Sequence, residues 1–187
     1  MNDFKKHSIE SAPEESKPIL KDAMQELGFI PNLYGALAES PNVLKGYVQI
    51  AENFMNSGFD DLEKQIILLT TSVHHHCSYC IAAHSTLADS LALPFDTIKK
   101  IRNNEPLEDT KWEALRQFTS QVVLNRGELT GEDLSKFLSH GYTKANILEI
   151  ILGVAMKVMS NYTNHVVGTP IDAVFQTPKI QELTTAS

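Results

Sequence analysis

Cysteine is scarce in this chain and confined to one place. Only two cysteines occur in 187 residues, Cys77 and Cys80. A small fold held together by disulfides needs several cysteines spread along the sequence, so this protein must fold on its hydrophobic core. Two thiols three residues apart indicate thiol chemistry or a metal site instead.

The chain also lacks long apolar runs and concentrated positive charge. Its longest apolar stretch, 147–159, is interrupted by Glu149 and Lys157 and is far shorter than the ~20 residues of a transmembrane helix. Residues 1–10 contain two lysines and no apolar run, so we expect neither a secretory signal nor a membrane anchor. The formal net charge of -7 disfavours nucleic acid as a partner. We therefore expect a cytoplasmic protein with no membrane and no nucleic-acid partner.

Motifs for cofactors are missing as well. The sequence contains no glycine-rich nucleotide loop, no flavin or haem signature and no internal repeat, so we expect no cofactor. Any reducing electrons must then come from an external thiol or a redox protein. The hydrophobic content of 42% and charged content of 21% are typical of a globular protein, and the length favours one domain.

Helical periodicity dominates the chain, whereas the alternation of a strand never persists for more than a few residues. We predict an all-α protein, with N-caps at Asp60 or Asp61, near Thr130, and at Thr143. The expected helices cover 13–28, 33–39, 42–56, about 60 to the cysteine segment, 77–91, 95–102, 109–125, 134–139 and 144–164. The last of these is apolar on two stripes, so we expect it to be central or to face a second subunit. Residues after 175 carry no clear signal, and we expect the last few to be mobile.

The strongest functional signal is the CSYC motif at 77–80 followed by His84. On a helix, at about 100° per residue, Cys77, Cys80 and His84 fall within roughly 60° of one another. A nearby imidazole or a helix N-terminus lowers the pKa of a thiol, and a second thiol can convert a sulfenic acid to a disulfide. These residues are the minimum parts of a thiol redox centre.

Two other interpretations of the cysteine pair stay open. A structural zinc site would combine the cysteines with His84 or with one of His74, His75 and His76, although such sites usually draw two ligands from a second element. Alternatively, the pair is inert and buried. For the three consecutive histidines we expect an exposed or hinge role rather than direct chemistry.

The flanking sequence resembles a known family. The segments FDDLEKQIILLTTS at 59–72 and CSYCIAAHS at 77–85 resemble the carboxymuconolactone decarboxylase superfamily, in its alkylhydroperoxidase D-like branch. The segments NYTNH, GTPID, GFIPNLY and AESP, which begin at 161, 168, 28 and 38, resemble one cysteine-containing subgroup. The resemblance implies an alkylhydroperoxidase D-like helical bundle that forms a homo-oligomer. It also implies an N-terminal helical extension over 1–58, a core over 59–175 and a tail over 176–187.

The resemblance assigns roles to the three motif residues. It implies that Cys80 attacks the peroxide, that Cys77 closes the disulfide and that His84 shuttles a proton. The implied function is a thiol-dependent alkylhydroperoxidase-like oxidoreductase that reduces hydroperoxides in antioxidant defence. The alternatives are a non-redox lactone decarboxylase of the same superfamily and a non-enzymatic redox sensor or interaction protein.

One position departs from the family pattern. The relay glutamate lies twelve residues before the first cysteine, where this chain has Gln65, and an amide cannot exchange a proton as a carboxylate does. The nearest acid, Glu63, lies about 200° away on a helix, so we expect it on an exposed face unless it replaces the relay. Asn161, Asn164 and His165 either line the pocket and accept a proton or satisfy the end of a helix.

The identity of the attacking thiol is also in question. A helix that begins at Cys77 would favour the thiolate at that residue, because the helix dipole acts at the N-terminus. The family resemblance assigns the attack to Cys80 instead. We follow the resemblance and predict the sulfenic acid at Cys80.

Overall fold

The computed structural model describes residues 4–182 of the chain. The helices are α1 (Lys17–Leu27), α2 (Asn32–Leu37), α3 (Pro41–Met55), α4 (Asp61–His74), α5 (Ser78–Ser90), α6 (Phe95–Arg102), α7 (Thr110–Leu124), α8 (Gly131–Ser139), α9 (Lys144–Val167) and α10 (Pro178–Glu182), with 3-10 turns η1 (Glu14–Ser16) and η2 (Ala173–Phe175). Residues 4–182 contain no strand, so the prediction of an all-α protein is confirmed. No helix within these bounds has the length and apolarity needed to cross a membrane.

The helix starts follow the predicted caps. Asp60, Thr130 and Thr143 each accept a hydrogen bond from the backbone N–H three residues further on, at 2.8, 3.2 and 3.2 Å. Each also forms a reciprocal capping box, which satisfies backbone donors that have no partner inside the helix. Gly168 ends α9 with φ at 68°, a left-handed conformation that glycine adopts without steric cost.

The prediction of one continuous helix over 13–28 is wrong in its first turn. Residues Glu14–Ser16 form a 3-10 turn, and the α-helix begins only at Lys17. The cause is Pro18, which lacks the N–H that a longer α-helix would use to bond the carbonyl of residue 14. At the other end of the chain, α10 forms where the sequence carried no signal, and the expectation of mobility in the last few residues falls outside the described range.

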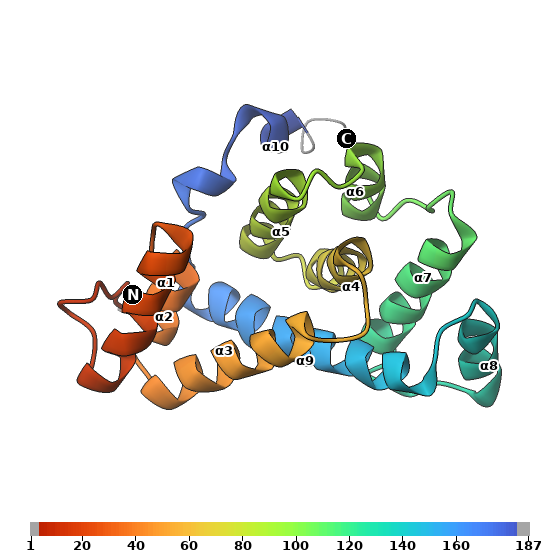
Figure 1. Cartoon of the computed structure of the whole chain (residues 1–187), viewed down its shortest axis with the longest axis horizontal. Coiled ribbons are helices and arrows are strands. Elements are labelled where there is room, and N and C mark those ends of the chain that lie inside the picture. Colours follow the sequence, from red (N-terminus) through yellow and green to blue (C-terminus); the bar gives the residue numbers. More distant parts are fainter. Residues whose placement is uncertain (1–3, 183–187) are drawn as a thin grey trace.

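Helix α4 lies at the centre of the bundle (Figure 1). It packs against α5, α6, α7 and α9, and its four consecutive residues 66–69 are fully buried. Helix α9 crosses α4 on the lower side of the bundle in Figure 1 and packs against α2, α3 and α4. It still exposes apolar side chains, with Leu148 67% and Tyr162 52% exposed. The proposed boundaries at 58 and 175 stay a prediction.

A buried polar network holds the start of α5 against α2 and against Asp172, the residue before η2. Tyr79 donates to the Asp172 carboxylate at 2.6 Å and accepts from the Leu33 backbone N–H at 3.3 Å. Asp172 also accepts from the Asn32 backbone N–H at 3.0 Å. Because Tyr79 stands between the two cysteines, this network orients the turn that carries both thiols.

Candidate active site

The two cysteines sit at the N-terminus of α5. Cys77 is the N-cap and Cys80 lies in the first turn. Both are free thiols, and they are only 1% and 2% exposed. The two thiols are close enough to interact through hydrogen bonding. The pair is therefore buried and in direct contact.

The surroundings make the two thiols unequal in acidity. The pKa of Cys80 is lowered below its usual value, first by hydrogen bonding with Cys77, while burial opposes the shift and the charge of Lys157 supports it. The pKa of Cys77 is raised, because its proton is held in that same hydrogen bond and the group is buried. These surroundings favour a thiolate at Cys80, whereas the helix-dipole argument alone favoured Cys77.

One face of α9 covers the thiols with polar side chains. Lys157, Ser160, Asn161 and Asn164 are all buried, and their spacing of i, i+3, i+4 and i+7 places them on one side of the helix. Asn164 Nδ2 donates to Cys80 Sγ at 3.3 Å and lies 3.7 Å from Cys77 Sγ. Ser160 Oγ lies 3.8 Å from Cys80 Sγ. Asn164 is thus the one side chain of this face that touches both sulfurs.

His84 lies between an amide and an ammonium. Its Nδ1 is 3.0 Å from Gln65 Oε1, and its Nε2 is 2.8 Å from Lys157 Nζ. Because an ammonium can only donate, Nε2 accepts from Lys157, and Nδ1 carries the ring proton that is donated to Gln65. Burial and the Lys157 charge hold the pKa of His84 well below its usual value. His84 is therefore neutral at physiological pH.

Lys157 is the residue that the sequence analysis missed. It is 1% exposed, and within residues 4–182 no ion pair includes it. The signal in the sequence was a single lysine inside the longest apolar stretch, at helical spacing from Ser160, Asn161 and Asn164. A basic residue on the polar stripe of an otherwise apolar helix indicates a buried functional charge.

Two predicted site residues lie elsewhere. Glu63 accepts from the Tyr142 hydroxyl at 3.0 Å and pairs with Lys111 at 2.9 Å. It is 5% exposed, so the expectation of an exposed Glu63 is wrong, and its partners place it outside the cysteine site. Glu63 lies outside the cysteine site because it and Gln65 face different sides of α4. His165 is exposed in the last turn of α9, where an imidazole complements the helix C-terminus.

The three histidines before the cysteines have different surroundings. His74 Nε2 lies 2.9 Å from Ser120 Oγ, and Asn161 Nδ2 donates to His75 Nδ1 at 3.0 Å. Burial lowers the pKa of both His74 and His75. His76 is exposed with φ at 54°, so it forms the turn from α4 to the cysteine motif. In the described part of the chain no three His, Cys, Asp or Glu side chains converge to hold a metal ion.

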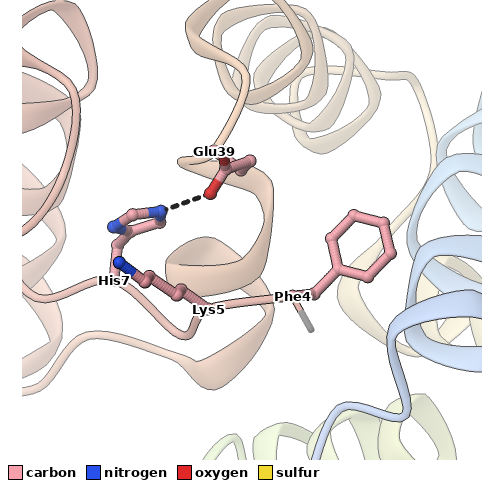
Figure 2. A pocket seen from close by; sticks show the side chains of 4 residues that line it. All are labelled: Phe4, Lys5, His7 and Glu39. Atoms are coloured by element: carbon pink, nitrogen blue, oxygen red, sulfur yellow. Dashed lines mark hydrogen bonds and ion pairs between the residues drawn. The ribbon is translucent and has the colours of Figure 1, made fainter. Parts of the chain in front are cut away.

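Two surface hollows lie near the N-terminal segment. One, of about 440 Å³, is lined by Phe4, Lys5, His7 and Glu39, and Figure 2 shows the imidazole of His7 facing the Glu39 carboxylate, with Phe4 apart from them. The His7–Glu39 distance is 2.7 Å. The other, of about 470 Å³, is an apolar groove between Phe4, the region 36–43 and the second half of α9. The described residues that line these hollows include none of the predicted site residues.

Comparison with known proteins bears on the fold. No family model and no curated protein matches the chain. The alkylhydroperoxidase AhpD core structure of an uncharacterized peroxidase-related protein from Ralstonia eutropha JMP134 is 18% identical, with a TM-score of 0.84 over 96% of this chain and 98% of its own. A peroxidase-related protein from Silicibacter sp. TM1040 is 20% identical, with a TM-score of 0.81 over 95% and 94% of the two chains. The debrominase Bmp8 is 17% identical, with a TM-score of 0.81 over 98% of each.

These likenesses establish the architecture. The chain has the alkylhydroperoxidase AhpD-like helical fold over nearly its whole length, as the family resemblance implied. Proteins with this fold include peroxidase-related proteins and a debrominase. Because the identities are low, the chemistry of this chain must be argued from its own residues.

Proposed function

We propose that this chain is a thiol-dependent peroxidase-type oxidoreductase that reduces hydroperoxides with Cys80 and Cys77. The observation that carries the proposal is the packing of two buried free thiols under Asn164, whose Nδ2 lies 3.3 Å from Cys80 Sγ and 3.7 Å from Cys77 Sγ. These surroundings lower the pKa of Cys80 and raise that of Cys77. A thiolate beside a protonated thiol is the state that a peroxide-reducing dithiol needs before each turnover.

The proposed reaction has two steps. The Cys80 thiolate attacks the terminal oxygen of the hydroperoxide, the O–O bond breaks, and an alcohol leaves once its alkoxide has gained a proton. The sulfur is thereby oxidised to a sulfenic acid. Cys77 then attacks Cys80 Sγ, water leaves, and an intramolecular disulfide forms. Asn164, which touches both sulfurs, holds them for this step.

The partners follow from this cycle. An external thiol or redox protein must return two electrons to the disulfide. We also propose a homo-oligomer, because α9 exposes the apolar side chains Leu148, Ile151, Tyr162 and Val166, which a second subunit would cover. A lactone decarboxylase needs no thiol pair, and a redox sensor needs the disulfide but no turnover, so both remain alternatives that experiment separates.

Trapping of the sulfenic acid tests the proposal. We expect a dimedone adduct at Cys80 in the Cys77→Ser variant treated with tert-butyl hydroperoxide, and no adduct at Cys77 in Cys80→Ser. An adduct only at Cys77 would reverse the roles of the thiols. Multiple turnovers with an added dithiol identify an enzyme, whereas one rapid disulfide without turnover identifies a sensor. Inert thiols in both variants would refute the proposal.

A further inference from the structure

Among residues 4–182, no carboxylate forms an ion pair with the Lys157 ammonium. Its side chain is 1% exposed, and its Nζ contacts the neutral acceptor His84 Nε2 at 2.8 Å. A buried ammonium is strongly unfavourable unless an opposite charge lies close to it. Among the residues around it, the acid that can supply this charge is the Cys80 thiol, which lies one helical turn before His84 on α5 and 3.8 Å from Ser160 Oγ of α9.

The helices place Lys157 against both reactive groups of α5. Cys80 and His84 are one turn apart on α5, and Lys157 and Ser160 are one turn apart on α9. Ser160 lies against Cys80, and Lys157 lies against His84. The ammonium therefore lies where the two helix faces meet, in contact with the imidazole and one helical turn along α9 from the residue that contacts the sulfur.

We propose that Lys157 takes the place of the missing relay carboxylate: its ammonium is the counter-ion of the Cys80 thiolate and the proton donor to the leaving alkoxide. This inference rests on the proposed function. As sulfur gives two electrons to the peroxide and the O–O bond breaks, one Lys157 proton passes to the alkoxide and an alcohol leaves. The neutral amine then takes the proton of Cys77 and passes it to the hydroxide that leaves the sulfenic acid. A proton from solvent restores the ammonium.

His84 and Gln65 have positioning roles in this arrangement. A cation at Nε2 opposes protonation of the ring, so His84 does not take up the thiol proton. The Gln65 carbonyl accepts from Nδ1–H at 3.0 Å, which turns the lone pair of Nε2 toward Lys157 and fixes the ammonium.

Other titratable groups also face the thiolate. Tyr47 of α3 and Tyr79 of α5 lie near Cys80, and burial raises the pKa of both, so both are neutral below pH 9. Cys77 keeps its proton because its pKa is raised. The pKa of His75, which follows α4, is lowered first by burial and then by nearby positive charges that include Lys157. Within this set Lys157 is the charged group, so removing it must alter the titration of Cys80.

The first test measures the pH midpoint of Cys80 alkylation in the reduced full chain by mass-resolved iodoacetamide labelling. We expect a midpoint below the usual thiol range in the parent protein and a midpoint higher by about one to three pH units in Lys157→Met. Lys157→Arg keeps the charge and is expected to retain the low midpoint. Lys144→Met removes an exposed lysine of the same helix and serves as the matched control. An unchanged midpoint in Lys157→Met overturns the inference. Circular dichroism verifies folding, and Lys157→Gln replaces Lys157→Met if the latter does not fold.

The second test separates proton donation from ionisation of the thiol. Oxidation of Cys80 is timed at a pH where the thiol is fully ionised, with tert-butyl hydroperoxide, whose alkoxide needs a proton, and with peracetic acid, whose carboxylate does not. Lys157→Met is expected to slow the first reaction at least tenfold and to change the second little. If Lys157→Met slows the oxidation of Cys80 equally with both oxidants, Lys157 is not the proton donor. A parent protein that reacts with neither oxidant, yet shows the Lys157-dependent midpoint, contradicts the peroxidase function alone.

Discussion

Restoring the carboxylate at position 65 should change the protonation of His84. Gln65→Glu places an acid of almost the same size at a fully buried position, with Oε1 3.0 Å from His84 Nδ1. Two unit charges at 3.0 Å attract by about 5 kcal/mol at an effective dielectric constant of 20, which corresponds to about four pKa units as an upper bound. Burial of the new carboxylate and the charge of Lys157 reduce the effect, so we expect the pKa of His84 to rise by about one to three units.

The titration of the His84 ring protons, followed by NMR, measures this shift. In the parent protein the ring stays neutral to a pH well below 6.5, because burial and Lys157 lower its pKa. In Gln65→Glu the midpoint should move up toward neutrality. The control is Gln25→Glu, which adds the same charge on the exposed surface of α1. A His84 midpoint that is equal in Gln65→Glu and Gln25→Glu would refute the geometry on which the site rests.

The remaining predictions concern stability. Tyr79→Phe removes a buried hydroxyl that donates to the Asp172 carboxylate at 2.6 Å. Urea denaturation should show that the free energy of unfolding falls by about 1–3 kcal/mol. A decrease below about 0.3 kcal/mol would contradict the network. Gly153→Ala places a Cβ 2.6 Å from the Phe54 ring and should lower the free energy of unfolding by about 1–3 kcal/mol. As its control, Gly46→Ala meets no atom within 4 Å and should raise the free energy of unfolding by about 0.5–1 kcal/mol. Equal effects of the two variants on the melting temperature would contradict the packing of α9. The folded-state pKa of His84 lies below its unfolded value. The stability that the neutral ring contributes is therefore present above about pH 6.5 and is lost as the pH falls below that value. If the free energy of unfolding of His84→Gln had the same pH dependence as that of the parent protein, this prediction would be wrong.

The sequence predicted most of the helices because their signals are local. Asp60, Thr130 and Thr143 mark helix starts through their own side chains, and the structure shows all three caps. The error at the first helix is local too, since Pro18 already indicated that the carbonyl of residue 14 would lack its partner. The motif at 77–80 and His84 share a helix, so helical spacing alone brought them near one another.

The rest of the site depends on contacts between helices, which spacing within one helix cannot reveal. Lys157 lies 73 residues from His84 along the chain, and only the packing of α9 against α4 and α5 brings the two together. Helical spacing places Glu63 about 200° from Gln65 and so predicts an exposed side chain, but the Tyr142 hydroxyl and Lys111, both distant in sequence, compensate its burial. The acidity of each thiol likewise depends on partners from α9.

Intact-mass thiol counting in a single turnover tests the central claim most directly. The reduced protein, verified to be free of metal, is mixed with one equivalent of alkyl hydroperoxide, and its remaining thiols are alkylated and mapped. We predict the loss of both thiols, a mass decrease of two hydrogens and a disulfide between Cys77 and Cys80, with one alcohol formed per chain. Two thiols that remain alkylatable after the peroxide is mixed in would contradict the peroxidase function.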